Sequence, residues 1–499
     1  MKNKIKVILN GKPITATKGL TLSEITNGER PCGGHGRCGK CKVLVNGHVS
    51  EPTSTECNVL SDNELAHGVR LACLTRALGD CEIETCSAVE KPQIVTDGVL
   101  PEFKLNPTFS DYGTAIDIGT TTLVARLYDN GGNLLFEVSH PNPQAKWGAD
   151  VISRIEAALD GNAKWLADTI QNALNDIFCE FAAVIDTKKI DGVVITGNTV
   201  MLSLLTGQSV EPFSHAPFDA KRLFGETLSA GDLSLSALLP ETQIYLPPCI
   251  SAFIGADITC ALLATKLCEG NTAMLADIGT NGEMALWHNG KLTVCSTAAG
   301  PAFEGVGISM GMRGVAGAID KVAVTDRQIK MHVINDQEPI GICGSGLVDA
   351  VACLIETGEI DETGRLKNDS ILLTSAVALF QKDIRMLQLA KSAICAGLLT
   401  LIDVNGLRPS DIQRFYIAGG FGNYLNKENA SRVGLLPKVL SNAMCTVGNA
   451  ALSGAVMILL DSTMKATAQN ISQKADVLDL STNCVFSEHY MMGMLFEEQ

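Results

Sequence analysis

Aromatic residues make up only 5% of the 499-residue chain, and charged residues only 19%. With 46% hydrophobic residues, this composition excludes a disordered chain, a coiled coil and a collagen-like repeat. Positive charge is scarce, because 39 Lys and Arg face 54 Asp and Glu, and the resulting net charge of −15 argues against a nucleic-acid binder. No apolar run of signal-peptide length occurs near the N-terminus. The longest apolar stretch, Ala450 to Leu460, is too short to span a bilayer.

We therefore expect a cytoplasmic protein with no membrane segment, in which clustered cysteines bind metal more often than they form disulfides. Seven of the 17 cysteines fall within residues 1–86, and the other ten are scattered. Charge divides at the same place, since residues 1–86 carry a net +2 and the remainder −17. The pattern predicts two chemically different modules, and the length predicts about three domains of ~150 residues.

The expected division of the chain follows from these patterns. Residues 88–110 contain three prolines and lack periodicity, so they are expected to be a linker. The domains are then 1–87, 111–270 and 271–499.

Strand patterns frame the clustered cysteines. Residues 4–9 alternate and then meet Asn10-Gly11, a hairpin signal. Residues 42–45 form a second strand pattern, which is expected to end at Asn46-Gly47. Between these patterns lies a C-x5-C-x2-C motif, and a further cysteine follows later; these residues are Cys32, Cys38, Cys41 and Cys73.

The motif favours an iron–sulfur cluster, which needs four thiolates converging on two irons, commonly three from one tight loop. Four glycines between residues 33 and 39 permit sharp bends and allow backbone N–H groups to approach sulfur. A zinc site or a set of buried thiols is the alternative, although zinc sites usually pair two C-x2-C arms. The spacing is one residue longer than the plant-type motif.

The segment resembles the [2Fe–2S] ferredoxin family, in which the longer spacing also occurs, and this implies an α+β domain of the β-grasp type. In that family Cys73 fits the fourth ligand, with Cys57, Cys81 and Cys86 as alternatives. His35 lies in the loop and is expected to be solvated rather than a ligand.

Two motifs occur twice in the remainder of the chain, in the same order. A short apolar strand followed by Asp-x-Gly-Thr occurs at Asp117 and again at Asp277. A Gly-Asn turn before an apolar helix occurs at Gly197-Asn198 and again at Gly448-Asn449. The repetition predicts a duplicated α/β domain.

The Asp-x-Gly-Thr turns favour phosphate binding. The carboxylate at the end of a buried strand can hold Mg²⁺, usually through water, while the turn offers backbone N–H groups and Thr hydroxyls to a phosphate. Two such turns facing each other could clamp a triphosphate, and catalysis would then need mainly positioning and charge neutralisation. A strand pattern over 415–418 also runs into Gly419-Gly420, where the backbone could lie flat against a base or ribose. An ordinary strand–helix turn is the alternative there.

Together these turns resemble the acetate kinase, sugar kinase, Hsc70 and actin superfamily, in which two ribonuclease-H-like halves close over ATP. The resemblance implies a first phosphate loop of Asp117, Gly119, Thr120, Thr121 and Thr122. It implies a second phosphate loop of Asp277, Gly279, Thr280 and Asn281, and an adenosine loop of Gly419, Gly420 and Phe421. Asn198 and Asn449 would lie on the helices that hinge the halves.

Three further segments, residues 142–155, 297–305 and 342–347, sharpen the resemblance. With the ferredoxin-like segment in front, nearly the whole chain resembles the reductive activators of corrinoid-dependent enzymes. Such proteins often carry an extra domain between the ferredoxin and ATPase parts, whereas only Val89–Phe109 fills that gap here. Linker geometry and dimer contacts of the family are therefore not carried over, although the sequence is compatible with a homodimer.

The resemblance implies ATP-dependent transfer of one electron from a [2Fe–2S] cluster to Co(II) of a corrinoid protein, which regenerates Co(I) for a methyltransferase system. ATP and Mg²⁺ would be the other cofactors, and the electron donor is not named by the sequence. One alternative is a small-molecule kinase with a redox-sensing ferredoxin domain. Another is an activator of 2-hydroxyacyl-CoA dehydratases, which the lack of clustered cysteines after Cys86 opposes.

Several single residues have competing interpretations. Asp150 and Arg154 share a helix face, and they form a surface ion pair, mark a helix start after Pro143, or line the cleft between the halves. Glu304 either orients the water that attacks ATP or caps a helix, and Ser296 lies in a small-residue run slim enough to approach the cobalt of a partner. Three later cysteines are expected to be structural: Cys249, Cys343 and Cys395.

Overall fold

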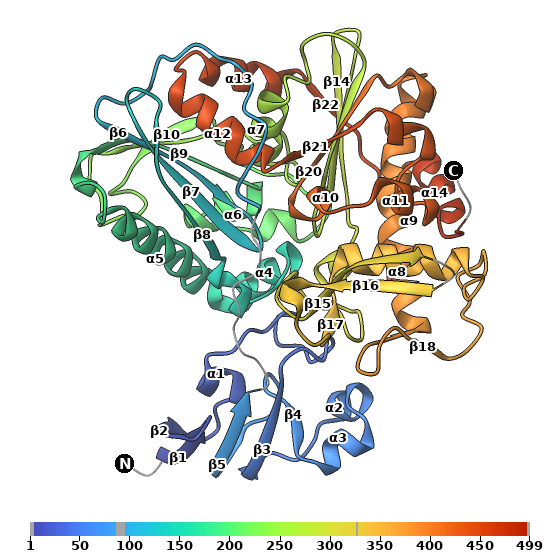
Figure 1. Cartoon of the computed structure of the whole chain (residues 1–499). Coiled ribbons are helices and arrows are strands. Elements are labelled where there is room, and N and C mark those ends of the chain that lie inside the picture. The colour runs from blue at the N-terminus through green and yellow to red at the C-terminus, as the bar shows by residue number, and fades with distance from the viewer. Residues whose placement is uncertain (1–3, 86–94, 326–327, 497–499) are drawn as a thin grey trace.

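The computed structural model describes residues 4–85, 95–325 and 328–496. Residues 4–85 form the cysteine-rich module, drawn in blue in Figure 1. Its five strands pair in the order β2-β1-β5-β3-β4, and β1 runs parallel to β5. The strands are β1 (Lys4–Leu9), β2 (Lys12–Thr17), β3 (Lys42–Val49), β4 (Val69–Leu71) and β5 (Ala77–Thr85). The helices are α1 (Leu22–Thr26), α2 (Ser54–Val59) and α3 (Asp62–Ala66). The predicted ferredoxin-like α+β module is confirmed.

The two turn predictions in this module have different outcomes. Asn10 and Gly11 join β1 to β2 with φ of 49° and 78°, as a tight hairpin requires. The prediction that the next strand ends at Asn46-Gly47 is wrong, because β3 continues to Val49 through a bulge. At Gly47, φ is 116° and an added Cβ would lie 2.7 Å from the Asp80 carbonyl oxygen. Glycine is therefore needed here for close strand pairing rather than for a turn.

The first half of the larger part contains a six-stranded sheet in the order β10-β11-β9-β6-β7-β8. Its strands are β6 (Tyr112–Ile118), β7 (Thr122–Asp129), β8 (Leu134–Pro141), β9 (Ile190–Gly197), β10 (Glu226–Ser229) and β11 (Gln243–Leu246). Its helices are α4 (Val151–Ala157), α5 (Ala163–Phe181), α6 (Thr199–Leu205) and α7 (Ala256–Ala264), with short turns at η1 (Pro143–Lys146), η2 (Ala158–Asn162), η3 (Thr187–Lys189) and η4 (Glu211–Phe213).

The second half has a sheet in the order β21-β20-β12-β13-β14-β22. Its strands are β12 (Ala273–Ile278), β13 (Gly282–His288), β14 (Lys291–Thr297), β20 (Arg414–Ala418), β21 (Met444–Gly448) and β22 (Ala475–Val477). Its helices are α9 (Gln381–Val404), α10 (Gly420–Asn423), α11 (Lys427–Arg432), α12 (Ala450–Leu460), α13 (Met464–Lys474) and α14 (Cys484–Met492), with short turns at η7 (Pro409–Asp411) and η8 (Lys438–Asn442).

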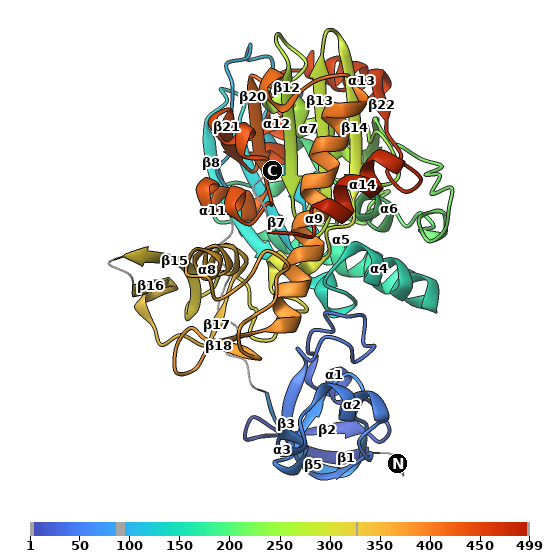
Figure 2. The same cartoon turned by 90° about the vertical axis from the view of Figure 1, so that its right-hand side faces the viewer.

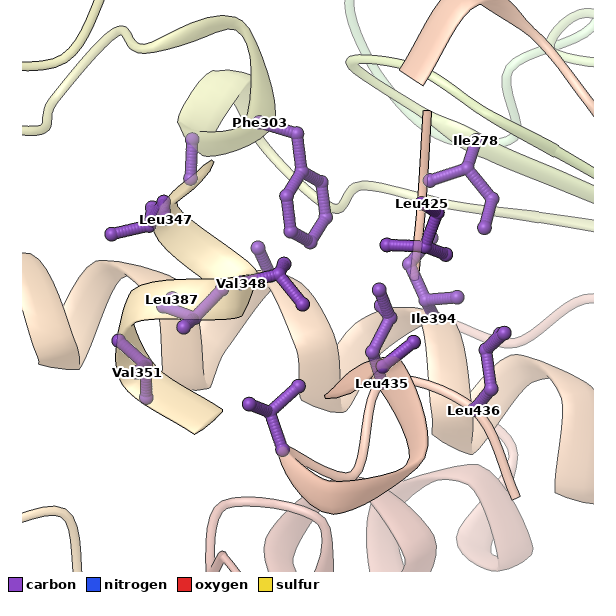
Figure 3. Packing of buried hydrophobic residues seen from close by; sticks show 14 of the residues in the cluster. Ile278, Phe303, Leu347, Val348, Val351, Leu387, Ile394, Leu425, Leu435 and Leu436 are labelled. Carbon is purple, nitrogen blue, oxygen red and sulfur yellow. The ribbon is translucent and has the colours of Figure 1, made fainter. Parts of the chain in front are cut away.

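An insertion lies between β14 and α9, drawn in yellow and light orange in Figure 1. It contains η5 (Pro301–Glu304), β15 (Ala318–Thr325), β16 (Gln328–Val333), η6 (Ile334–Asp336), β17 (Gly341–Ile342), α8 (Gly344–Glu356), β18 (Ser370–Leu372) and β19 (Ala378–Phe380). Its apolar residues join the core of the second half, where Phe303 and Val348 gather near Leu387 of α9 (Figure 3). Helix α9 is the one helix of the described chain long and apolar enough to cross a membrane, but it is mostly buried inside the protein, as core helices are.

The sheet orders confirm the predicted duplication, because β8-β7-β6-β9-β11 corresponds to β14-β13-β12-β20-β21. The pairing of the two Gly-Asn turns is wrong, however. Gly197-Asn198 follows β9, whose counterpart β20 leads into Gly419-Gly420, whereas Gly448-Asn449 follows β21, whose counterpart is β11. The turns look alike because each Asn caps the helix that follows, through a bond from the backbone N–H of Met201 or of Leu452.

Helices α7 and α12 pack against each other between the two sheets (Figure 1). Helix α12 contacts β6 and β9 of the first half, although it belongs to the second half in sequence. Asn449 begins α12 and so lies on a helix between the halves. The prediction of a hinge helix at Asn198 is wrong, although Asn198 itself lines a cavity between the halves. Asn198 begins α6, which packs within the core of the first half.

The described part of the predicted linker is attached to the second half. The N–H of Val99 donates to Val447 O at 3.1 Å, and the N–H of Asn106 donates to Leu460 O at 2.8 Å. Phe109 is buried in the core shared by both halves. The predicted lack of helix and strand is correct for residues 95–109, but these residues are not a free tether. The other part of the linker prediction, residues 88–94 with Pro92, lies outside the described residues.

Candidate functional site

A cavity of about 330 Å³ opens between the two halves, within the usual size range of small-molecule sites, ~300–1,000 Å³. It is lined by every residue of the two predicted phosphate loops and the predicted adenosine loop. These residues are Asp117, Gly119, Thr120, Thr121, Thr122, Asp277, Gly279, Thr280, Asn281, Gly419, Gly420 and Phe421. Glu304 also lines the cavity. The structure therefore brings together four segments that are far apart in the sequence.

The two phosphate loops have the same construction. Each connects two antiparallel strands, β6 to β7 and β12 to β13. In the first loop the N–H of Gly119 donates to Thr122 O at 2.9 Å, and in the second the N–H of Gly279 donates to Asn281 O at 3.0 Å. The similar tight turns leave Thr hydroxyls beside a strand-end carboxylate on both sides of the cavity.

Asp117 is held by a residue from the other half. Nδ2 of Asn449 donates to Oδ2 of Asp117 at 2.9 Å. Burial and, to a lesser extent, the nearby charge of Asp277 raise the pKa of Asp117 to about 7, against the bond from Asn449. Burial raises the pKa of Asp277 to about 6. Both carboxyls are therefore poised to lose a proton when a cation arrives.

Three more carboxyls line the cavity that the sequence analysis did not select, those of Asp257, Glu283 and Asp320. Asp257 begins α7, and burial with the charges of Asp277 and Asp117 raises its pKa to about 8. Burial, followed by the charge of Asp257, raises the pKa of Glu283 well above its ordinary value. Glu283 lies two residues after Asn281 of the second predicted phosphate loop, so its position was a usable signal. The only signal at Asp257 was an acidic residue two positions after Gly255, at the start of an apolar helix. This donor set of carboxylates suits Mg²⁺, which prefers oxygen ligands.

Glu304 lies in η5 and reaches the second phosphate loop. Oγ1 of Thr280 donates to Oε1 of Glu304 at 2.6 Å. Oε2 of Glu304 is buried and has no hydrogen-bond partner. Burial raises the pKa of Glu304 to about 7. A buried polar atom without a partner at the wall of a cavity fits a site that is completed by a bound ligand or water.

The predicted adenosine loop contains an aromatic residue that stacks on the insertion. Phe421 stacks on Phe303, with ring centroids 4.4 Å apart and planes at 19°. At Gly419, φ is 88° and an added Cβ would lie 2.6 Å from Oδ1 of Asp277. Glycine is therefore required where this loop passes the second phosphate loop.

Arg154 is neither a surface residue nor exposed to the cavity. Asp150 instead caps α4, accepting a bond from the N–H of Ser153 at 2.7 Å. The Arg154 side chain is fully buried and donates to Gly148 O at 2.9 Å and to Thr120 O. The predicted helix start is therefore confirmed at Asp150, whereas the surface ion pair and the placement of Arg154 in the cleft are wrong, since Arg154 supports the first predicted phosphate loop from behind.

Ser296 lies on β14 directly opposite Glu283 of β13. Opposed residues of antiparallel strands face the same side of a sheet, so Ser296 lies on the face of the sheet that Glu283 presents to the cavity. It is partly exposed and does not itself line the cavity. Cys249, Cys343 and Cys395 are buried, as expected of structural cysteines.

The four cysteines of the predicted cluster form two contacting pairs. The Sγ atoms of Cys41 and Cys73 lie 3.3 Å apart. A hydrogen bond with Cys38 lowers the pKa of Cys32 to about 4 and raises the pKa of Cys38. A two-iron cluster takes two thiolates on each iron, which this arrangement matches. Zinc sites usually pair two C-x2-C arms, whereas the described cysteines supply only the arm of Cys38 and Cys41, so the alternative of a zinc site is not favoured.

The backbone of the cysteine loop points donors at sulfur. The N–H groups of Gly36, Arg37 and Cys38 lower the pKa of Cys32, and that of Lys40 acts in the same direction on Cys38. At Gly36, φ is 71° and an added Cβ would lie 2.4 Å from the Leu74 side chain. Among the alternative fourth ligands, Cys57 is exposed, Cys81 is buried in the core below the sheet, and Cys86 lies outside the described residues. The loop fits an iron–sulfur cluster held by the four paired thiols.

Fold and site together define a class of protein, an ATPase of two duplicated halves that carries a cysteine-rich redox module. Three family models match the chain in order: a 2Fe-2S iron-sulfur cluster binding domain at residues 8–78, the RACo middle region at 112–270, and the C-terminal domain of RACo, the ASKHA domain, at 271–499. The chain belongs to the RACo family of reductive activators of corrinoid proteins.

Individual relatives agree with this assignment. The chain is similar to the corrinoid activation enzyme RamQ of Eubacterium limosum, with 36% identity over 77% of this chain and 70% of that protein. It is 27% identical to the [Co(II) methylated amine-specific corrinoid protein] reductase of Methanosarcina barkeri, over 78% of this chain and 77% of the relative. Among solved structures, the reductive activator for corrinoid, iron-sulfur protein superimposes with a TM-score of 0.70 at 28% identity, covering 98% of each chain.

Proposed function

We propose that this protein uses ATP to drive the transfer of one electron to the Co(II) form of a corrinoid protein, which regenerates Co(I) in a methyltransferase system. The observation that carries the proposal is the presence in one chain of a loop with two cysteine pairs and a carboxylate-lined cavity between two halves. The activities named for the relatives support the same reaction.

The N-terminal module would hold the redox group through Cys32, Cys38, Cys41 and Cys73. When bound, a [2Fe–2S] cluster supplies a one-electron carrier between an external donor and the cobalt of the partner. The N–H groups aimed at sulfur stabilise the thiolates, and such hydrogen bonds tune the potential of a bound cluster.

The cavity would hold the triphosphate of ATP between the two phosphate loops, and Mg²⁺ near Asp117, Asp257 and Asp277. Gly419, Gly420 and Phe421 would contact the adenosine. Glu304, which already accepts a hydrogen bond from Thr280, is placed to orient a water towards the terminal phosphate. Ser296 is the residue proposed to face the partner's corrinoid.

ATP is needed because the electron must move uphill. Plant-type [2Fe–2S] ferredoxins have potentials of about −400 mV. A tenfold change in equilibrium for a one-electron step takes about 59 mV, or ~1.4 kcal/mol. A coupling free energy of a few kcal/mol between the nucleotide and partner states would therefore change the equilibrium of electron transfer by about a hundredfold or more.

The alternative functions have less support. An activator of 2-hydroxyacyl-CoA dehydratases would need cluster ligands in the ATPase part, where Cys249, Cys343 and Cys395 are among the buried, dispersed cysteines. A small-molecule kinase would not explain the paired thiols, and the two curated relatives that match more than three quarters of the chain are a corrinoid activation enzyme and a corrinoid reductase. We also propose a cytoplasmic location, because the paired thiols must stay reduced to hold a cluster.

The test is an anaerobic mixture of iron-loaded protein, a chemical reductant, Mg-ATP and a candidate Co(II) corrinoid protein, followed by visible spectroscopy. We expect the Co(I) spectrum to appear with ATP and not without it. Equal reduction with and without ATP would overturn the proposed coupling. A Ser296→Ala variant forms a separate arm, and unchanged reduction by this variant would remove Ser296 from the site.

A further inference from the structure

The cysteine loop rests directly on the ATPase part of the molecule. Both views place the blue N-terminal module below α4 and the β15–β17 region (Figures 1 and 2). Lys40 lies between the predicted ligands Cys38 and Cys41, and its Nζ donates to Ile308 O at 2.9 Å and to Gly311 O at 2.8 Å. One side chain of the cluster loop is thus bonded to two backbone carbonyls of the insertion.

The segment that receives Lys40 continues from Glu304. Residues 305–312 are tightly folded, because a Cβ added at Gly311 would lie 2.4 Å from Gly305 O. Asp383, buried at the start of α9, fixes the middle of the segment by accepting bonds from the N–H of Ser309 at 2.7 Å and from its Oγ at 2.8 Å. A displacement of Glu304 by a bound nucleotide would therefore be transmitted to the carbonyls that hold Lys40.

A second contact joins the module to the cavity itself. Arg313 lines the nucleotide cavity, and its guanidinium also lies 3.7 Å from a carboxylate oxygen of Glu29 in the module. The remaining contacts reach the first half, where the N–H of Ala149 donates to Pro31 O at 3.0 Å. The module is therefore docked beside both phosphate loops.

We propose that Lys40 and Glu29 form a latch that links docking of the N-terminal module to nucleotide occupancy, such that each state disfavours the other. The sign follows from charge. Docking places the Glu29 carboxylate beside Arg313 and partly neutralises a cation that would otherwise attract the phosphates of the nucleotide. By linkage, a nucleotide that recruits Arg313 weakens docking by the same factor and frees the cysteine loop for a partner. The inference rests on the proposed function only in taking the ligand of the cavity to be ATP.

The test compares two lysines of the cysteine loop in the full-length, iron-loaded protein. Lys40→Met removes the latch. Lys42→Met is the matched control, because Lys42 lies next to Cys41 but pairs with Glu64 at 2.5 Å inside the module. Glu29→Gln removes the ion pair while leaving the Lys40 bonds in place. The electron paramagnetic resonance signal of the reduced cluster shows whether each variant keeps a folded loop.

Calorimetric titration with a non-hydrolysable Mg-ATP analogue gives the main readout. We expect Lys40→Met and Glu29→Gln to bind the analogue more tightly than the wild type, by about fivefold for Lys40→Met, the lower end of typical coupling between sites. Lys42→Met should bind as the wild type does. Equal or weaker affinity of Lys40→Met with an intact cluster signal would overturn the latch.

Hydrogen exchange gives a second readout that does not depend on the electron transfer reaction. The analogue should increase exchange at the N–H of Ala149 in the wild type, because its bond to Pro31 is a docking contact. In Lys40→Met this exchange should already be fast without the analogue. Unchanged exchange in both proteins would contradict the inference, whereas failure of the wild type to bind any nucleotide would instead refute the proposed function.

Discussion

Five of the carboxyl groups that line the cavity between the halves come from five different elements, and burial raises the pKa of each of these five. Without a bound cation, each of these groups holds a proton in the folded protein at pH values between its unfolded and folded pKa, where the unfolded chain has lost that proton. A carboxyl whose pKa is raised by folding contributes stability that is fully present below its unfolded value and is lost as pH rises through its folded value. The stability of the nucleotide-free protein should therefore fall between about pH 5 and 8.

Asp257 offers the test of this pH dependence, because its pKa is raised to about 8. Asp257→Asn cannot ionise, so it should unfold at a higher temperature than the wild type at pH 8 and show a weaker decline from pH 5.5 to 8. We expect a gain of about 2–4 °C, which corresponds to ~1 kcal/mol in domains of this size. Asp369→Asn, at an exposed position, is the control for thermal unfolding. A decline as steep in Asp257→Asn as in the wild type would contradict the role of this carboxyl.

Glu304 is the residue whose chemistry the structure describes most directly, with one oxygen bonded to Thr280 and the other without a partner. Glu304→Gln keeps the shape but cannot accept a proton from water. We expect ATP hydrolysis to fall by about 10²-fold, the lower range for a general base, with ATP affinity little changed. Phosphate release in single-turnover experiments measures the rate, with the exposed Glu488→Gln as the control. Hydrolysis at the wild-type rate would remove Glu304 from the catalytic machinery.

At the scale of elements, the strand end that carries Cys73 depends on one buried ion pair. Glu56 of α2 is fully buried and bonds Arg70 through Nε at 3.1 Å and Nη2 at 3.0 Å, and it also accepts the N–H of Leu71 at 3.2 Å and the hydroxyl of Thr75 at 2.9 Å. These bonds fix the backbone on both sides of Cys73. The ion pair of Glu56 and Arg70, which joins α2 to β4, therefore sets the position of Cys73.

Removal of Glu56 should destabilise the module by about 3–5 kcal/mol, because it leaves Arg70 buried without its partner. Glu64→Ala is the matched control, since Glu64 occupies the same capping position in α3 but makes a more exposed pair with Lys42, worth about 0–1 kcal/mol. Urea unfolding followed through the visible absorbance of the cluster measures both variants. Equal urea midpoints for Glu56→Ala and Glu64→Ala would show that the buried pair does not support the cysteine loop.

Local chemistry explains which elements could be predicted from the sequence. The Asn10-Gly11 hairpin and the Asp-x-Gly-Thr turns of Asp117 and Asp277 depend on a few adjacent residues, so their sequences determine their geometry. The sequence could not show that the two Gly-Asn turns follow non-corresponding strands of the two halves, because an Asn caps a helix in the same way wherever the helix lies. Asp257 and Arg313 reach the cavity only through the packing of α7 and of the insertion, which adjacent residues do not reveal.

At the scale of the whole molecule, the cavity depends on a helix that belongs to one half in sequence and packs on the other. Helix α12 returns from the C-terminal half to pack on β6, and it places Asn449 on Asp117. The first phosphate loop is therefore completed by a residue from the far end of the chain, so the nucleotide site requires both halves to be folded.

Asn449→Ala should consequently weaken ATP binding by roughly tenfold, the effect of about 1.4 kcal/mol, which is typical of one hydrogen bond to a charged group. Titration of the full-length protein with a non-hydrolysable ATP analogue measures the change. Asn442→Ala, an exposed asparagine in the same half, is the control. Wild-type affinity in Asn449→Ala would show that the contact between the halves does not contribute to nucleotide binding.

The anchoring of residues 95–109 on the second half sets a limit on how far the redox module can travel. A chain that joins Thr85 to Val95 cannot exceed about 36 Å even when fully extended. A module released from its docking contacts therefore keeps Thr85 within that distance of Val95, which itself lines the cavity between the halves. The cysteine loop can then reach only as far as this tether and the size of the module allow, so a corrinoid partner must bring its cobalt within that reach to be reduced.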